Sequence, residues 1–179
     1  MLDALEVSAH LYELNRLASA GELTGFAANN EREEYMKQQF ARQYRDAMKR
    51  DGTAPHVIVE MGSAHLSRGQ SAFGPFAFGN LLADMATANG FRLVNMVVLA
   101  HNAPADSAAP NLWKWADMRP LAIAAPSNQV TVIDLRPLRP FLYSGKLGTI
   151  GPDLRRTIYG YDFAVLIGNA TDATESALR

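Results

Sequence analysis

The sequence contains no cysteine. This absence excludes disulfide bonds, thiolate nucleophiles, zinc sites built on thiolates and iron–sulfur clusters. The sequence also lacks an excess of either charge, because 17 lysine and arginine residues stand against 18 aspartate and glutamate residues and the net charge is -1. Nucleic-acid-binding domains commonly carry a basic excess, so we expect no nucleic-acid partner.

Long apolar runs are absent as well. No run approaches the roughly 20 apolar residues that a membrane-spanning helix requires, and residues 1–6 lack the basic and apolar segments of a signal peptide. The sequence therefore predicts a cytoplasmic protein without a membrane span. Export stays open if the native N-terminus lies upstream of Met1.

The 179 residues, of which 48% are hydrophobic, suffice for one compact core. The sequence shows no internal repeat and no boundary between two domains. We therefore predict a single domain over residues 1–179.

Three segments have the apolar spacing of amphipathic helices, namely residues 2–19, 31–51 and 80–88. Asn30 would cap the second helix, with Glu33 in the capping-box position three residues later. The predicted buried stripe of the first helix is Leu2, Leu5, Ala9, Tyr12 and Leu17, with Leu11 and Leu14 beside them. That of the second helix is Tyr35, Met36, Phe40, Tyr44, Ala47 and Met48.

Four apolar runs, at residues 57–59, 91–100, 130–133 and 163–167, predict strands. The runs are apolar at successive positions and are separated by helices or long connections, which is typical of strands that are covered on both faces. The sequence therefore predicts an α/β fold with a mixed, mostly parallel sheet flanked by helices.

Polar residues follow several of these runs, at the sheet edge where the sites of parallel sheets gather. They include Glu60, His65, His101 and Asp134. Asp134 is expected to form a structural pair with a neighbouring arginine, with a catalytic role as the alternative.

The segment from Glu60 to Gly69 is the sharpest feature, because a glycine turn follows the first strand and exposes a histidine. His65 has the chemistry of a general base, with Glu60 placed to hold its ring. Arg68 would bind a carboxylate or phosphate or neutralise an oxyanion. A structural interpretation is open equally: His65 bonded to a neighbouring carbonyl, and Arg68 paired with an acid such as Glu60.

Residues 57–69, together with residues 79–83 and 90–93, resemble the C-terminal half of erythromycin-esterase-like proteins. In that family a strand ends in an Ala-His-Asn-Ala-His-like turn, and His65 matches the second histidine. Residues 31–36 are similar to the family's Arg-Asp-x-x-Met helix start, with Arg32 on the arginine. Gly62-x-x-His65 is also similar to the Gly-x-x-His motif of the related haem-uptake and TraB-like proteins, some of which are metal-dependent peptidases.

The resemblance implies His-based hydrolysis of an ester-type or related small molecule. His65 would be the base, Arg68 and Arg32 would bind anions, and Glu60 would orient the histidine or share its proton. The sequence departs from the family at the first histidine, where Met61 or Gly62 stands.

The family's earlier half, with its Gly-Glu-x-His-like motif, has no counterpart in this sequence. We therefore expect the chain to be the C-terminal part of a longer protein, with the sheet edge protected by the missing half or by a second copy. A non-catalytic binding or structural domain that keeps the fold is the alternative function. A metal-dependent hydrolase is a weaker one, because the four histidines form no His-x-x-x-His pair. No metal ligand and no cofactor is predicted.

Overall fold

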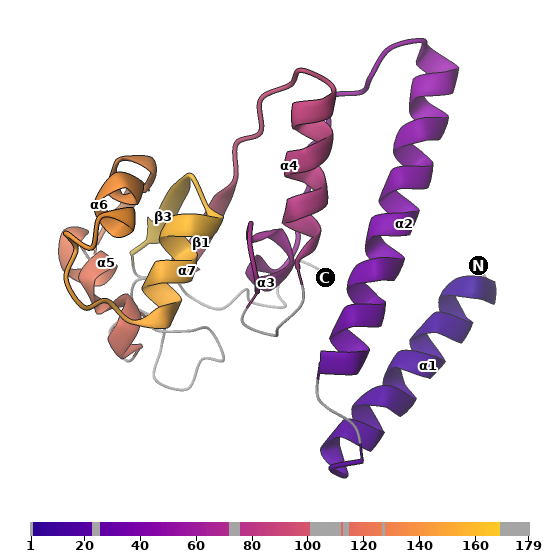
Figure 1. Cartoon of the computed structure of the whole chain (residues 1–179), viewed down its shortest axis with the longest axis horizontal. Coiled ribbons are helices and arrows are strands. Elements are labelled where there is room, and N and C mark those ends of the chain that lie inside the picture. The colour runs from indigo at the N-terminus through magenta and orange to yellow at the C-terminus, as the bar shows by residue number, and fades with distance from the viewer. Residues whose placement is uncertain are drawn as a thin grey trace, which may run out of the picture. The chain divides into compact units, whose positions relative to one another are not determined.

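The computed structural model describes residues 2–22, 26–71, 76–100, 112, 115–126 and 128–168 (Figure 1). The chain divides into two compact units, Met1–Leu93 and Val94–Arg179. The prediction that both belong to one domain stays a prediction.

The first unit contains four described helices, of which α2 contacts both α1 and α4, and α4 also contacts α3 (Figure 1). Their bounds are α1 (Leu2–Ser19), α2 (Phe26–Asp51), α3 (Ser63–Leu66) and α4 (Phe78–Ala88). Helix α1 has its predicted bounds. Helix α2 begins at Phe26 instead of residue 31, so Glu33 lies about two turns inside the helix and the capping-box prediction is wrong.

Helix α1 buries only part of its predicted stripe. Leu5 and Tyr12 of the predicted stripe are exposed, whereas Leu11 and Leu14 are buried and Val7 packs against them. The latter three residues are spaced by four and three positions, which places them on one helix face. Helix α1 carries apolar side chains on both faces, so the spacing alone did not determine which face is buried.

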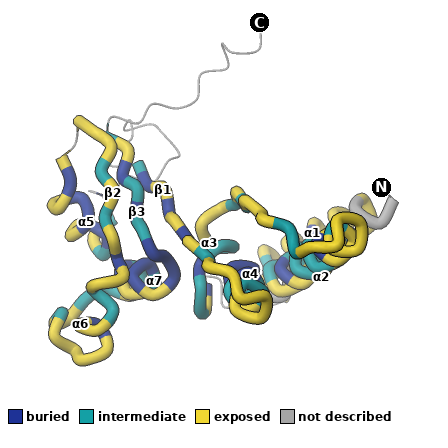
Figure 2. Tube along the Cα trace, turned by 90° about the horizontal axis from the view of Figure 1, so that it is seen from above, coloured by how far each residue is buried: buried dark blue, intermediate teal, exposed yellow. Residues whose placement is uncertain are grey.

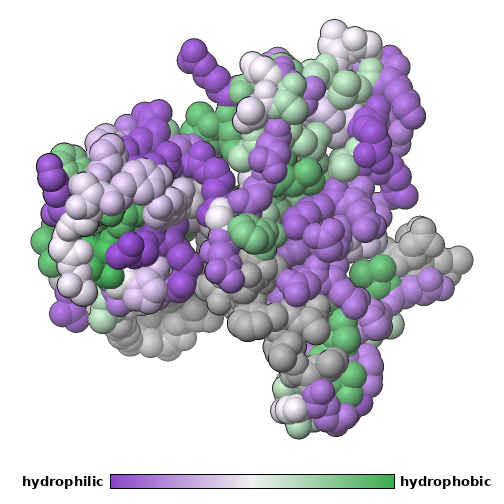
Figure 3. Space-filling model, viewed as in Figure 1, coloured by the Kyte–Doolittle hydropathy of each residue, from purple (hydrophilic) through white to green (hydrophobic). Residues whose placement is uncertain are grey.

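Helix α2 carries hydrophilic side chains over most of the face that Figure 3 shows. Its apolar residues lie on another face, where Tyr44 is buried and Tyr35, Met36 and Phe40 are half-buried. Met48, at the end of the predicted stripe, is exposed. The stripe prediction is therefore confirmed for the middle of the helix.

The strand predicted at residues 57–59 is wrong. This segment is neither helix nor strand, and it pairs with no other part of the chain that the structure describes. Ile58 is fully exposed, with a relative exposure of 101%. A run of three β-branched residues is at the short limit of natural strands, and it forms one only where a neighbouring strand supplies hydrogen bonds.

The second unit is built around a three-stranded sheet in the order β1-β3-β2. Strand β3 pairs with β1 in parallel and with β2 in antiparallel orientation. An α/β fold with a mixed sheet is therefore confirmed, with one parallel and one antiparallel pair. The elements are β1 (Met96–Ala100), the 3-10 turn η1 (Ala116–Met118), α5 (Arg119–Ala124), β2 (Val130–Asp134), the 3-10 turn η2 (Arg136–Leu138), α6 (Arg139–Tyr143), α7 (Pro152–Gly160) and β3 (Phe163–Ile167).

The core of the second unit lies on one face of this sheet. Val97 and Leu99 of β1 and Ala164 and Leu166 of β3 are buried, and they alternate with more exposed residues as strand geometry requires. Helix α7 buries the face that carries Leu154, Thr157 and Ile158, whereas Arg155 and Tyr159 are exposed, and Figure 2 shows both classes along the helix. Its Ile158 is among the largest fully buried side chains of the described residues.

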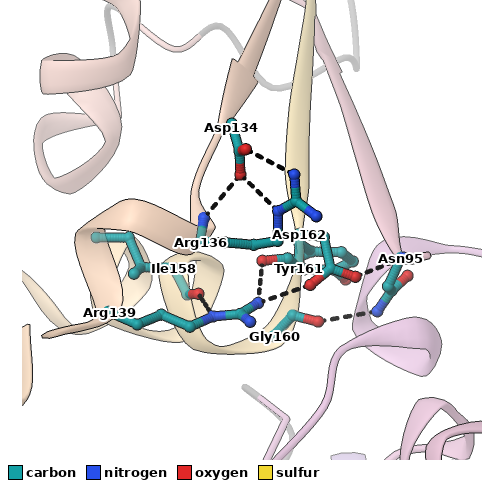
Figure 4. Close-up of polar contacts among 8 residues, drawn as sticks. All are labelled: Asn95, Asp134, Arg136, Arg139, Ile158, Gly160, Tyr161 and Asp162. Carbon is teal, nitrogen blue, oxygen red and sulfur yellow. Dashed lines mark hydrogen bonds and ion pairs between the residues drawn. The ribbon is translucent and has the colours of Figure 1, made fainter. Parts of the chain in front are cut away.

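A partly buried ion pair links Arg139, the first residue of α6, to Asp162 in the connection between α7 and β3 (Figure 4). Arg139 Nη2 lies 3.0 Å from Asp162 Oδ1 and also donates to the carbonyl oxygen of Tyr161 at 2.7 Å. Arg139 Nε donates to the carbonyl oxygen of Ile158 at 3.0 Å, near the end of α7. The backbone N–H of Asn95, just before β1, donates to Asp162 Oδ2 at 2.9 Å. The Asp162 carboxylate therefore has a partner at each oxygen.

Asp134 forms the arginine pair that the sequence predicts. Arg136 donates to the two Asp134 oxygens at 2.9 Å and 2.7 Å, and its guanidinium lies 4.6 Å from the centre of the Phe163 ring (Figure 4). The side-chain hydrogen bond from Arg136 lowers the pKa of Asp134 below its ordinary value. The contact is that of a structural pair at the end of β2.

We expect the loss of the aspartate to lower the free energy of unfolding by different amounts in the two ion pairs. Asp162→Ala should lower the free energy of unfolding by about 3 kcal/mol, because it leaves the Arg139 charge half-buried without its carboxylate. Asp134→Ala is the matched control: the Asp134 carboxylate is solvated, so its removal should change stability little. Urea denaturation of both variants measures the difference, and equal losses would contradict the assigned role of Asp162.

Candidate active site

A buried glutamate and a histidine form the centre of the candidate site in the first unit. Glu33 of α2 places Oε1 2.5 Å from Nδ1 of His65 on α3. The Glu33 side chain is 4% exposed and the His65 side chain is 23% exposed. A carboxylate with so little access to water needs charged or hydrogen-bonded partners, and His65 supplies one.

The second oxygen of Glu33 is also bonded. The backbone N–H of Phe78 donates to Glu33 Oε2 at 2.7 Å. Phe78 is the first residue of α4, and the N-cap residue Ala77 has no side-chain oxygen for the free N–H groups of that helix. Glu33 therefore does from α2 what an N-cap side chain does locally, and its negative charge faces the positive end of the α4 dipole.

Aromatic packing joins the same two helices. The Phe40 ring of α2 meets the Phe78 ring edge to face, with centroids 5.2 Å apart. Phe40 lies seven residues after Glu33 and so on the same side of α2. Phe78 thus contributes its N–H to the carboxylate and its ring to the apolar contact between α2 and α4.

Because Gly79 has no side chain, the backbone of α4 lies directly against the backbone at the end of α3. A Cβ atom at this position would lie 2.0 Å from the carbonyl oxygen of Leu66, the residue after His65, and 2.9 Å from that of Ser67. No side chain fits such a gap. The absence of one at Gly79 therefore helps to set the distance between His65 and the first turn of α4.

Asn80 holds the chain just beyond His65. Its Oδ1 accepts the Gly69 N–H at 2.8 Å, and its Nδ2 donates to the Gly69 carbonyl oxygen at 2.9 Å and to that of Ala77 at 3.0 Å. Gly69 has φ +85, a conformation that favours glycine. The turn after α3 is therefore fixed by both backbone groups of Gly69.

The contact with Glu33 assigns the proton of the neutral histidine. A carboxylate accepts, so His65 Nδ1 carries the hydrogen and Nε2 carries the lone pair. Nε2 makes no hydrogen bond within the described residues. A carboxylate on Nδ1 orients an imidazole and stabilises its protonated form, which is the arrangement of a general base.

The structure brings together only part of the predicted site. His65 is at its centre, but the carboxylate on its ring is Glu33 and not Glu60. Glu60 is exposed, and within the described part of the chain no hydrogen bond or ion pair joins it to His65. The correction follows from the missing strand: Glu60 lies on an irregular segment, whereas Glu33 projects from a regular helix.

The two predicted arginines are half-buried. Arg32 is adjacent to Glu33 on α2, and Arg68 lies two residues after the end of α3. Their roles as anion-binding groups stay predictions. His101 lies outside the described residues.

The position of Glu33 in the sequence indicates a buried carboxylate, which the sequence-based prediction did not recognise. Glu33 lies three, seven and eleven residues before Met36, Phe40 and Tyr44, which is the spacing of one helix face. A carboxylate on an apolar stripe is buried when the helix packs, and a buried carboxylate needs a partner. The capping-box interpretation hid this signal because it placed Glu33 at a helix end.

Comparison with known proteins gives no match: neither a family model, nor a curated protein, nor a solved structure is similar to this chain. Across the residues that the structure describes, no three or more histidine, aspartate or glutamate side chains are grouped so that they could hold a metal ion. No helix in this described part is both long and apolar enough to cross a membrane.

Gly79→Ala should destabilise the protein although alanine favours helices by about 1 kcal/mol over glycine. The new Cβ would collide with the Leu66 carbonyl oxygen, and such overpacking typically costs about 1–3 kcal/mol. Thr87→Ala, at an exposed position of the same helix, is the control and should be neutral or slightly stabilising. Thermal unfolding measures both; a Gly79→Ala variant more stable than the wild type would contradict the close contact.

Proposed function

We propose that this chain is a hydrolase domain in which His65 acts as general base on an ester-type or related substrate. The observation that carries the proposal is the carboxylate of Glu33, buried and bonded to His65 Nδ1. Because the proton is on Nδ1, the lone pair of Nε2 can accept a proton from a water molecule.

The resemblance to erythromycin-esterase-like proteins agrees with this pair. With Arg32 on the arginine and Met36 on the methionine of the Arg-Asp-x-x-Met pattern, Glu33 falls on the aspartate. His65 falls on the second histidine of the other motif. The two motifs place their acid and their histidine 32 residues apart in the sequence, and the two side chains are in contact. This agreement supports membership of that superfamily as part of the proposal.

The proposed reaction is hydrolysis by an activated water. Nε2 of His65 accepts a proton from water as the water oxygen bonds to the carbonyl carbon of the ester. Glu33 stabilises the imidazolium that forms, and Arg68 or Arg32 neutralises the oxyanion of the tetrahedral intermediate. The bond to the alkoxide then breaks, and Nε2 returns its proton to the leaving alcohol, so that an acid and an alcohol are released.

His65→Ala should lower kcat/KM for p-nitrophenyl butyrate by about 10²–10⁴-fold, because it removes the base. It also takes one of the two partners from the buried Glu33 carboxylate, so the melting temperature should fall while the chain stays folded at the assay temperature. His10→Ala is the matched control, since His10 also binds a glutamate, Glu31, at 2.9 Å, but on the surface. That variant should hydrolyse at the wild-type rate. Stopped-assay kinetics and thermal unfolding of both variants separate loss of chemistry from loss of fold.

Glu33→Gln tests the pair more finely. The glutamine oxygen still accepts the Phe78 N–H, but its NH₂ group donates to His65 Nδ1 and so moves the ring proton to Nε2. A base with its lone pair buried is inactive, and the analogous change in serine proteases costs about 10⁴-fold in kcat. We expect a loss of at least about 10²-fold with a smaller change in melting temperature than for Glu33→Ala. Wild-type rates in both His65→Ala and Glu33→Gln would refute the proposed catalysis.

A non-catalytic binding or structural domain is the second candidate. It is favoured by the Phe78 N–H on Glu33, which gives the carboxylate a structural task of its own. In that case the wild type hydrolyses no ester, and His65→Ala changes only the stability of the protein.

A further inference from the structure

Three consecutive residues at the start of α4 each hold a different part of the candidate site. The Phe78 N–H binds Glu33, the bare backbone of Gly79 lies against Leu66, and the Asn80 side chain binds Gly69. The segment from His65 to Gly69 is thus held by the first turn of α4 at both ends: through Glu33 at His65, and directly by Asn80 at Gly69.

The Asn80 side chain binds both backbone groups of Gly69, as the backbone of a neighbouring strand would do. The amide accepts from the N–H of Gly69 and donates to its carbonyl oxygen, at 2.8 Å and 2.9 Å. Its second N–H donates to Ala77 O at 3.0 Å, so both donors and the acceptor of the amide are used. A side chain held in this way has one orientation, and Gly69 is fixed with it.

Arg68 immediately precedes Gly69. Fixing both backbone groups of Gly69 therefore fixes the point from which the Arg68 side chain departs. The Glu33–His65 pair is fastened to Phe78, two residues before Asn80 on the same helix. The helix turn is rigid, so the departure point of Arg68 is constant relative to the imidazole of His65.

We infer that Asn80 is a positioning residue of this site, which fixes the backbone beside Arg68 so that this arginine can meet an oxyanion or another anionic group of the substrate. The inference rests on the proposed function for its catalytic meaning. Electrostatic stabilisation depends on such prearrangement, and a shift of about 1 Å costs up to about 10²-fold in rate.

The test compares Asn80→Ala with Asn89→Ala in the full chain. Asn89 also donates from its side chain to a backbone oxygen of α4, that of Met85, but at the exposed far end of the helix. Asn80→Ala should lower the ¹⁵N order parameters of the Arg68 and Gly69 amides and speed Gly69 amide exchange at least about tenfold, the worth of one hydrogen bond. Asn89→Ala should change neither.

A double-mutant cycle with p-nitrophenyl butyrate adds the catalytic readout. Asn80→Ala alone should lower kcat/KM about tenfold or more, and should cause no further loss when Arg68 is already alanine. Equal losses in both backgrounds would overturn the inference, because Asn80 would then not act through Arg68. Unchanged order and exchange at Arg68 and Gly69 would overturn it as well. An inactive wild type refutes only the proposed hydrolysis, since the amide measurements still decide whether Asn80 positions Arg68.

Discussion

The buried carboxylate of Glu33 is the group on which the first unit's arrangement depends. Removing a carboxylate from water costs far more than any single contact returns, so its partners cannot be exchanged freely. His65 and the Phe78 N–H occupy its two oxygens, and they come from two other helices. The same interaction that compensates the charge therefore brings α2, α3 and the start of α4 together and places a histidine among them.

The second unit also contains a buried carboxylate, that of Asp162, but its charged partner is an arginine and not a histidine. Asp162 is bonded to Arg139 and to the backbone of Asn95, and Arg139 also binds backbone oxygens at the end of α7. Arginine stays protonated at any pH that proteins meet, so the partner of Asp162 cannot act as a base. The partner of Glu33 is an imidazole, which can. This chemical difference, and not burial, is why the candidate active site lies in the first unit.

The helices α1 and α4, strand β3 and the Asp134–Arg136 pair follow from local patterns, and the sequence predicts them closely. His65 was recognisable because glycines on both sides mark a turn. The strand at residues 57–59 was wrong because a strand depends on a distant neighbour, which local β-propensity does not report. The expected contact of Glu60 with the His65 ring depended on that strand, and Glu33 contacts Nδ1 instead. A role of Glu60 in the site stays a prediction. Glu33 depends on tertiary packing in the same way. Its place on the apolar face of α2 was visible in the sequence, but its partners were not.

The central claim is that Glu33 sets the tautomer of His65. The most direct measurement is the ¹⁵N NMR spectrum of the His65 ring, assigned by comparison with His65→Ala, in the wild type and in Glu33→Gln. For the neutral ring we predict a protonated Nδ1 and an unprotonated Nε2 in the wild type, and the reverse in Glu33→Gln. A wild-type ring with its proton on Nε2, or one that Glu33→Gln leaves unchanged, would contradict the claim.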